Sequence, residues 1–337
     1  MAERTKKQHV RIKDVAELAD VSAQTVSNVL NGRIGFTPET RDRVMQAVEA
    51  TGYRPDPAAR NLRTRRSRRI GFSMSEENLD PRNPFALAFL QEILSAAHEL
   101  DRRVIMLLHD TEADGTFRAD VDAREVDGFI LANSAPGDYR VSMLTEHHVP
   151  FALMGRTEPG QPQPWMDIDN FAAIAPAVDH LVERGHREFA FVGYAGEQHW
   201  NRDRLNGVRH RLASHGLTLP DDRVVESTLD AAEGGLVRLL RQTDRPTAVI
   251  TSSDSLGVLA VGTARAVGLR VPEDIAVTGF DGGVLANSTM PPLTTVRIPV
   301  ARIARELMAR LESDIELGAS TAGGEIVETE LVIGGTT

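Results

Sequence analysis

Polar and aromatic side chains follow many of the short apolar runs in residues 70–337, and together they could bind a small molecule. They occur in segments such as "FILAN", "FALMG", "WMDIDN" and "AVTGFD". If these runs are parallel strands, their carboxyl ends meet at one edge of a sheet, where such side chains converge. The candidates are Asn83, Phe85, Phe89, Asn133, Ser134, Arg156, Asp169, Asn170, Trp200, Asn201, Arg202, Arg204, Asp254 and Asp281.

Common catalytic motifs are absent from the sequence. It has no P-loop, no G-x-S-x-G, no G-x-G-x-x-G and no H-E-x-x-H, and it contains no cysteine. His147 and His148 are adjacent and point apart, while His180 and His186 suit capping or packing better than metal binding. The sequence therefore predicts that the chain is not an enzyme and holds neither a metal nor a cofactor.

The elements that must position the binding side chains alternate along residues 70–337. Short apolar runs at 70–74, 104–108, 129–131, 151–154, 189–192, 248–251 and 275–279 alternate with amphipathic segments near 85–100, 171–185, 203–215, 231–242 and 255–268. Such alternation is typical of parallel βαβ units. This number of strands predicts two doubly wound sheets, with the ligand site between the two subdomains.

A different pattern precedes this body. Apolar residues at helical spacing occur in 15–19, stop, and return in 26–30. Ser22 can cap the second helix, Gly32 can end it, and Thr37 followed by a proline can start a third. Three short helices with this break predict an all-α helix-turn-helix head.

The head and the body are joined by "YRPDPAARNLRTRRSRR", residues 53–69. A helix of one or two turns here is too short to be stable alone in water. We expect it to order only against a partner, with Leu62 as its one large apolar side chain among arginines. Alternatively, this segment is only a basic linker between the head and the body.

Charge is divided unevenly along the chain. Residues 1–69 hold 15 Lys and Arg against 8 Asp and Glu, although the whole chain has a net charge of −10. A basic head on an acidic body predicts that only the head binds a polyanion. Alternatively, the basic segment is an arm that is exposed to solvent. The N-terminus lacks the apolar segment of a signal peptide, and no run is long enough to span a membrane. We therefore expect a soluble, cytoplasmic protein.

Three segments carry a resemblance to a known family. "IKDVAELADVSAQTVSNVLNG", "TPETRDRVMQAVEATGYRPDPAARNL" and "VPEDIAVTGFDGG…PPLTTVRIP" are similar to the lactose-repressor (LacI/GalR) family of bacterial transcription regulators. The resemblance covers nearly the whole chain. It implies a helix-turn-helix head on a periplasmic-binding-protein-like α/β body, and a homodimer that binds a pseudo-palindromic operator and responds to a small-molecule effector.

The resemblance also implies roles for matching residues of the head. Ala23, Gln24 and Asn28 match positions that read base edges in the major groove, and Gln can pair with adenine. The family often has Arg where this chain has Asn28, so the resemblance does not predict which operator sequence is preferred. Ser22, Thr25, Ser27 and Asn31 would contact phosphates. Ala59 and Leu62 match the hinge helix, whose leucine pair wedges a base step from the minor groove.

For the body, the resemblance selects effector contacts among the candidates. Arg202, Asp254 and Asp169 match positions that hydrogen-bond an effector, and Asp281 matches the family's "GFDD" motif, written "GFDG" here. Arg and Asp suit vicinal hydroxyls, and an aromatic side chain suits the apolar face of a sugar. The predicted effector site comprises Asn83, Phe85, Asn133, Asp169, Trp200, Arg202, Asp254 and Asp281. A carbohydrate or its derivative is the expected effector, with a purine or nucleoside as the alternative.

The predicted boundaries follow from these matches. The helix-turn-helix domain is 1–54, the hinge helix and linker 55–69, and the effector-binding and dimerisation domain 70–337. Within the last, one subdomain is about 70–170 with 299–324, and the other about 171–298 with 325–337. The alternative from another class is a two-lobed sugar-binding transport protein, which would carry an export signal in place of the head.

Overall fold

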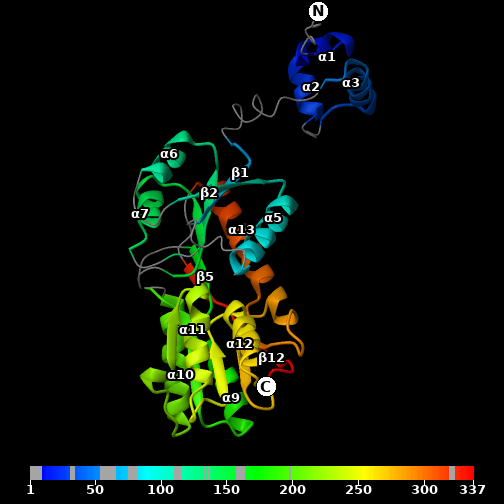
Figure 1. The fold of residues 1–337 in the computed structure, drawn as a ribbon. Coiled ribbons are helices and arrows are strands. Elements are labelled where there is room, and N and C mark those ends of the chain that lie inside the picture. Colours follow the sequence, from blue (N-terminus) through cyan, green and yellow to red (C-terminus); the bar gives the residue numbers. More distant parts are fainter. Residues whose placement is uncertain are drawn as a thin grey trace, which may run out of the picture. The chain divides into compact units, whose positions relative to one another are not determined.

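The computed structural model describes residues 10–30, 35–53, 66–74, 82, 84–109, 115–132, 134, 137–156, 164–196, 199–318 and 323–337. It divides into two compact units, a head (Met1–Ser67) and a body (Arg68–Thr337), which Figure 1 shows in blue and in cyan to red.

The head contains three short helices, α1 (Ile12–Leu18), α2 (Ala23–Leu30) and α3 (Pro38–Thr51). The Thr25 N–H donates to Ser22 Oγ over 3.0 Å, so Ser22 caps α2 as the sequence predicted. Thr37 caps α3, and Gly52 ends it in a left-handed conformation with φ of 64°. Arg11 supplies no side-chain cap to α1, but its N–H donates to Asp14 Oδ2 over 2.7 Å, which holds the start of that helix.

A small apolar core joins the three helices of the head. Val15, Val26 and Val44, one from each helix, are completely buried. Ala16, Ala19, Val29 and Ala47 complete the core. The apolar spacing on which the head was predicted therefore marks its buried face except at Leu18, which is 59% exposed, and Gln24 of α2 faces solvent.

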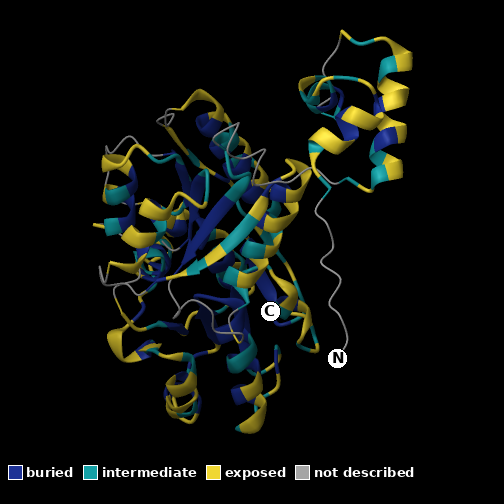
Figure 2. Cartoon of the chain, turned by 90° about the horizontal axis from the view of Figure 1, so that it is seen from above, coloured by how far each residue is buried: buried dark blue, intermediate teal, exposed yellow. Residues whose placement is uncertain are grey.

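In the body, the first lobe contains a parallel sheet with the strand order β11-β5-β4-β3-β1-β2. Its strands are β1 (Arg69–Met74), β2 (Arg103–Leu108), β3 (Gly128–Leu131), β4 (Phe151–Met154), β5 (Pro164–Asp167) and β11 (Gly323–Ile326). Its helices are α5 (Phe85–Glu99), α6 (Thr116–Ala123), α7 (Tyr139–Glu146) and α13 (Val300–Leu317). Figure 2 shows buried strands at the centre of the body and exposed outer faces on its helices.

The second lobe repeats this plan with the order β12-β10-β9-β8-β6-β7. Its strands are β6 (Phe189–Tyr194), β7 (Val224–Ser227), β8 (Ala248–Thr251), β9 (Ala276–Asp281), β10 (Thr294–Arg297) and β12 (Glu330–Val332). Its helices are α8 (Asn170–Ala173), α9 (Ala175–Glu183), α10 (His199–Ser214), α11 (Leu229–Leu240) and α12 (Asp254–Ala266), with short 3-10 helices η2 (Asp221–Arg223) and η3 (Val284–Asn287). Strand β12 runs antiparallel to β10, so this sheet is parallel except at one edge.

The chain passes between the lobes three times: after β5, after β10 and after β11. The third crossing lies beyond Ile326, because Gly323–Ile326 pairs with β5 in the first sheet. Helix α13 starts at the second crossing and packs against α5 in the first lobe.

All seven predicted strands are present, but five others were not predicted: β5, β7, β10, β11 and β12. Each has only three or four residues, and segments such as "PWMD" and "GGEI" have no apolar run of their own. Their extended conformation is set by pairing with neighbours distant in sequence, which a local pattern does not reveal.

Candidate functional sites

The exposed face of α2 in the head carries small polar side chains. Gln24 is exposed, and its Nε2 donates to Asn28 Oδ1 over 3.0 Å, one helical turn further on. Ser22 Oγ and Thr25 Oγ1 lie 2.9 Å apart at the start of the same helix. The segment 22–30 contains no charged residue. This face can therefore offer amide and hydroxyl hydrogen bonds without strong charge.

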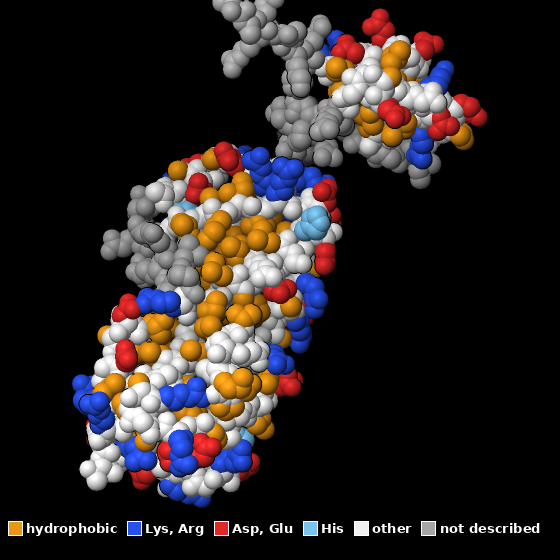
Figure 3. All heavy atoms as spheres, turned by 45° about the vertical axis from the view of Figure 1, so that its right-hand side comes forward, with side chains coloured by type: hydrophobic (Ala, Val, Ile, Leu, Met, Phe, Trp, Pro, Cys, Tyr) orange, Lys and Arg blue, Asp and Glu red, His pale blue; other side chains and the backbone are white. Residues whose placement is uncertain are grey.

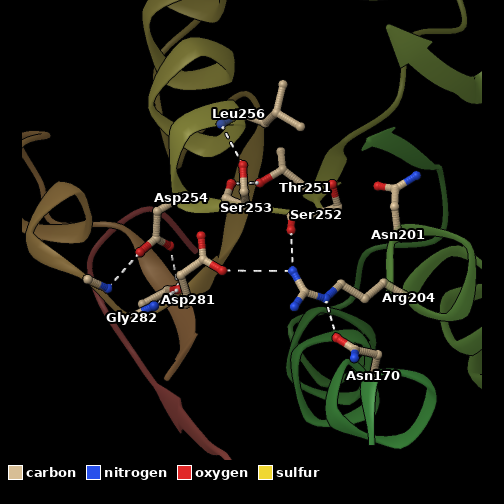
Figure 4. Close-up of polar contacts among 12 residues, drawn as sticks. Asn170, Asn201, Arg204, Thr251, Ser252, Ser253, Asp254, Leu256, Asp281 and Gly282 are labelled. Carbon is tan, nitrogen blue, oxygen red and sulfur yellow. Dashed lines mark hydrogen bonds and ion pairs between the residues drawn. The ribbon is translucent and has the colours of Figure 1, made fainter. Parts of the chain in front are cut away.

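In the body, a buried polar cluster is centred on Arg204 of α10 (Figure 4), and the charge of Asp167, at the end of β5 in the first lobe, acts on it as well. Its side chain is only 6% exposed. Arg204 Nε donates to Asn170 Oδ1 over 2.9 Å, and Nη1 donates to the Ser252 carbonyl over 2.6 Å. Nη1 also lies 3.8 Å from Asp281 Oδ1. The guanidinium is therefore fixed by groups from α8, α10 and the ends of β8 and β9.

Aromatic rings cover both sides of this arginine. The Arg204 guanidinium carbon lies 3.5 Å from the Phe280 ring centroid and 4.8 Å from that of Trp200. Trp200 meets Tyr194 edge to face at 5.8 Å, and Tyr194 Oη is 3.1 Å from Ser253 Oγ. These cation–π contacts help to hold the guanidinium in place.

Three carboxyl groups surround Arg204. Burial raises the pKa of Asp254 to about 6, although hydrogen bonds from Thr295 and Gly283 oppose this. Burial and the neighbouring Asp254 raise the pKa of Asp281 well above its usual range. Burial raises the pKa of Asp167 as well, against its ion pair with Arg156. Burial in turn lowers the pKa of Arg204 to about 10. We call Arg204, Asp281, Asp254, Asp167 and Trp200 the interlobe site.

Backbone geometry at Asp281 is unusual. Its φ is 119°, a value that residues other than glycine rarely adopt. The next residue, Gly282, has φ of 67°, and a Cβ there would lie 2.5 Å from the Arg297 Cα. Strained backbone that is held in place by its surroundings is often found at ligand sites. At Asp281 such a position carries a carboxyl group at the end of a strand.

A separate shallow groove of about 370 Å³ lies on the outer edge of the second lobe. It runs between β7 and α11 and is lined by Glu226, Ser227 and Arg238 among others. Neither Arg204 nor Asp281 lines it. The groove is therefore distinct from the interlobe site.

Comparison with known proteins decides the family. A model described as "Bacterial regulatory proteins, lacI family" matches residues 11–56, and a "Periplasmic binding protein-like domain" matches residues 178–337. The HTH-type transcriptional regulator CelR of Thermobifida fusca is 33% identical over 329 residues, covering 95% of this chain and 96% of that protein. The chain belongs to the lacI family of bacterial transcriptional regulators.

Other members of the lacI family agree. The HTH-type transcriptional repressor CytR of Escherichia coli is 30% identical over 332 residues, covering 97% of this chain and 96% of that one. A structure of a CelR–cellobiose complex matches with a TM-score of 0.72 and 28% identity, covering 97% of this chain and all of the other. The lac repressor dimer bound to operator and the anti-inducer ONPF matches the fold with a TM-score of 0.83 at 23% identity, covering 98% of this chain and 99% of that one. These relatives are DNA-binding regulators, as the sequence predicted, and the transport alternative is not favoured.

Two of the predicted effector contacts of this lacI-family member are placed away from the interlobe site. Arg202 is exposed, and its Nη2 lies 2.6 Å from His199 Nδ1. Asp169 is exposed and caps α8, accepting from the N–H groups of Phe171 and Ala172. In each case a residue two positions away, Arg204 or Asp167, has its side chain in the cluster instead.

Helical phase explains the exchange of Arg202 for Arg204. Arg204 lies on the same face of α10 as the buried Leu205, Val208 and Leu212, whereas Arg202 lies on the outside. Asn201, one turn before Arg204, is also buried and is bonded to the Tyr194 backbone. The spacing of apolar residues in the sequence indicates which face of α10 is buried. The resemblance, however, pointed to Arg202.

The remaining predicted contacts divide into three groups. Asp281 and Trp200 belong to the interlobe site. Asp254 does as well, but Thr295 Oγ1 and the Gly283 N–H occupy its two oxygens at 2.5 and 2.9 Å, so it shapes the loop that follows Asp281. Phe85 is half-buried at the start of α5 and packs on the main apolar core. The predictions for Asn31, Ala59, Leu62, Asn83 and Asn133 lie outside the described residues.

Among the described residues, no group of three or more histidine or carboxylate side chains suited to a metal ion occurs. No helix in the described part of the chain is long and apolar enough to cross a bilayer.

Proposed function

We propose that this lacI-family regulator is a homodimeric repressor whose operator affinity is set by a carbohydrate bound at the interlobe site. Arg204 carries the effector part of this proposal, because it is buried, fixed by several partners and placed where strand ends from both lobes approach. Such preorganised donors favour binding, since little ordering remains to be done when a ligand arrives. Because its target is chromosomal DNA, we place the protein in the cytoplasm.

The face of α2 supports the DNA-reading part of the proposal. Ala23, Gln24 and Asn28 would contact base edges, and the amide groups of Gln24 and Asn28 match the hydrogen-bonding pattern of adenine. Ser22, Thr25 and Ser27 would contact phosphates and fix the register. Asn31, Ala59 and Leu62 keep the roles that the resemblance implies for them, as predictions.

For the effector, the interlobe site offers the groups that bind a polyol. Arg204 and Asp281 present a donor and an acceptor side by side, which suits adjacent hydroxyl groups. Trp200 and Tyr194 offer ring faces or edges for the apolar surface of a sugar. The similar CelR structure holds cellobiose, and this favours a carbohydrate over a purine or nucleoside. Arg204 and Asp167 thus take the roles first expected of Arg202 and Asp169.

Exposed apolar side chains support the homodimer. On the first lobe, Leu87 and Leu94 of α5 are 40% and 47% exposed, and Met106 and Leu108 of the edge strand β2 add to them. Figure 3 shows hydrophobic side chains gathered on one face of this lobe. A contiguous apolar patch on a polar surface marks a protein interface. On the second lobe, Met290 is 80% exposed and would extend the contact.

The test measures operator binding as a function of salt and of effector. DNA fragments from the host's promoters are selected with the full-length protein, and the affinity is then measured at several salt concentrations with and without candidate sugars. We expect a preference for one pseudo-palindromic sequence over random DNA, an affinity that falls as salt rises, and a further change with effector. Equal affinity for random DNA at every salt concentration would show that the proposed function is wrong.

The matched variants for this test are Arg204→Met and Arg202→Met. The first should still bind operator but lose its response to the effector, because only Arg204 faces the interlobe site. The second should respond like the natural protein. If Arg202→Met loses the response to the effector and Arg204→Met keeps it, Arg202 is the effector contact, as the resemblance first implied.

A further inference from the structure

Helix α11 of the second lobe, which packs against α12 and β7 (Figure 1), has two faces of different character. Ala232, Leu236, Leu239 and Leu240 are buried and belong to the apolar core beneath the helix. The opposite face follows the spacing i, i+3, i+4, i+7, i+8, i+11, which places its residues along one side of a helix. We call it the α11 face, and it consists of Asp230, Glu233, Gly234, Val237, Arg238 and Arg241. Val237 is half-buried and the others are exposed, so this face is turned toward solvent.

The charges of the α11 face are sorted along the helix. Asp230 and Glu233 lie in its first half, whereas Arg238 and Arg241 lie at its end. This order suits the helix dipole, which favours acidic residues at the start of a helix and basic residues at its end. In the described part of the chain, Glu233, Arg238 and Arg241 have no ion-pair partner, whereas Asp230 pairs with Arg82. Three charged side chains on one helix face are therefore available to a partner.

The spacing of these charges has a symmetry that the helix dipole does not require. Glu233 and Arg238 lie equally far from the midpoint of the α11 face, on opposite sides of it, and the same holds for Asp230 and Arg241. Two copies of α11 placed antiparallel would therefore bring a carboxylate opposite a guanidinium at all four positions. A two-fold contact between identical chains requires a surface that is complementary to itself in this way.

The centre of the α11 face allows a second helix to approach closely. Gly234 has no side chain, and a Cβ placed there would meet no other atom within 4 Å. Gly234 and Arg238 also line the shallow groove of about 370 Å³ between β7 and α11. Gly234 and Val237 are related by the same symmetry as the charged residues, so Val237 of a second copy would lie against Gly234. Because the distance between packed helices depends on the side chains at the contact, a glycine here permits the short end of the usual range of about 8–10 Å.

We propose that α11 is a contact between two copies of this chain, in which the two α11 helices lie antiparallel about a two-fold axis. Glu233 of each copy pairs with Arg238 of the other, and Val237 lies against Gly234. Exposed ion pairs add little affinity, but between packed helices they set orientation and partner choice. The contact is therefore weak and specific. The apolar patch of α5 and β2 belongs to the first lobe, so the α11 contact is additional to it.

This inference goes beyond the proposed function and does not depend on it. The residues proposed to contact operator and effector lie in the head and at the interlobe site, and none of them is on the α11 face. Self-association at α11 can therefore be measured with the full-length protein in the absence of DNA and effector. A protein without operator preference would contradict the proposed function and would leave this inference unaffected.

Charge reversal tests the predicted ion pairs. The background is Leu94→Glu, which disrupts the apolar patch of the first lobe, and self-association is followed by sedimentation equilibrium at low salt. Either Glu233→Arg or Arg238→Glu turns two attractive pairs into two repulsive ones, and we expect each to weaken association at least about tenfold. Both reversals together restore opposite charges across the two-fold axis, so association should return to within about threefold of the background. Glu183→Arg, at the exposed end of α9, is the matched control and should change nothing.

Three results of this experiment would overturn the inference. The background protein could remain monomeric at every concentration, or the single reversals could leave its association unchanged. The double reversal could also associate as weakly as the single ones, which would show that the α11 face binds a different surface. Unfolding temperatures separate association from stability, because the helix dipole makes the double reversal the least stable variant although its association is restored.

Disulfide cross-linking tests the register of the two helices, because the natural chain contains no cysteine. Full-length Gly234→Cys and Val237→Cys are prepared separately and then mixed under mild oxidation. A disulfide needs Cα atoms about 4.4–6.8 Å apart, so only closely apposed positions react efficiently. We expect the mixture to form covalent dimers faster than either variant alone, and Glu183→Cys mixed with Val237→Cys to form none above background. A mixture that reacts no faster than the separate variants would overturn the predicted register and with it the inference.

Discussion

Replacing Arg204 by methionine should test the electrostatics of the interlobe site most directly. Methionine keeps much of the apolar length that packs between Phe280 and Trp200, but it removes the buried positive charge. Asp281 and its neighbours would then lack their shared cation. Removing one partner of a buried ion pair costs about 3–5 kcal/mol, because the remaining charge stays buried. We expect the body to lose about that much free energy of unfolding near neutral pH.

The loss should depend on pH in a direction set by the raised pKa values. Burial raises the pKa of Asp254 from 3.8 to about 6, so between these values the folded protein holds a proton that the unfolded chain has released. Stability from this group therefore falls as pH rises through that window, by about 3 kcal/mol in total, and returns as pH falls. Arg204 lowers the pKa of both Asp254 and Asp281, so in Arg204→Met both groups take up protons more readily. The deficit of the variant should shrink at mildly acidic pH.

The assay is urea unfolding followed by tryptophan fluorescence, since both tryptophans, Trp165 and Trp200, are in the body. The natural protein and Arg204→Met are compared near pH 7 and near pH 5. Arg202→Met, an exposed neighbour, is the control and should stay within about 0.5 kcal/mol of the natural protein. A deficit for Arg204→Met below about 1 kcal/mol at neutral pH, or one of equal size at both pH values, would refute this reasoning.

Three further predictions concern other parts of the molecule. Gly207→Ala should destabilise the body by about 1–3 kcal/mol in urea unfolding, because a Cβ there would lie 2.2 Å from the Phe171 carbonyl oxygen; an equally stable variant would contradict the close packing of α8 and α10. Gln24→Ala should reduce discrimination between operator and altered sequences by about 1–3 kcal/mol in competition titrations, and unchanged discrimination would remove Gln24 from base reading. Leu94→Glu should shift the protein toward monomer in analytical ultracentrifugation and weaken operator binding, and an intact dimer would place the interface elsewhere.

Much of the architecture was predictable because it depends on local periodicity. The helices of the head follow from apolar spacing and from caps such as Ser22 and Thr37, whose hydroxyls act within one turn. The central strands follow from apolar runs that are buried on both faces, as in β3 and β8. Edge strands such as β11 and β12 were missed, because their conformation depends on partners far away in the sequence.

The interlobe site was predictable in position but not in detail. Asp281 was expected at a strand end and is the last residue of β9, whereas Trp200 lies in the first turn of α10. Which of two nearby residues turns inward was decided by packing: α10 presents Arg204 because Leu205 and Val208 are buried on that side. The role of Asp254 depends on Thr295 and Gly283, which approach it only in the folded chain.

Helix α13 connects the second crossing between the lobes to the first residues of the body. Helix α13 begins at Val300, directly after the second crossing, and its 18 residues extend about 27 Å. Near its far end, Glu312 accepts from Arg102 Nε and Nη2 at 2.8 Å each. Arg102, 3% exposed, also pairs with Asp127, and Asp127 Oδ2 accepts from the Arg68 N–H over 2.9 Å.

Arg68 is the residue at which the body unit begins, and its φ of 57° shows that the chain is held there in a rarely occupied conformation. A buried ion-pair network of this kind gives little net stability, because desolvation offsets the attraction between its charges. What it does provide is defined geometry among α13, the end of α5 and the start of β3. In the described part of the chain, the start of α13 and Arg68 are thus connected by one packed helix and by the hydrogen-bonded side chains of Glu312, Arg102 and Asp127.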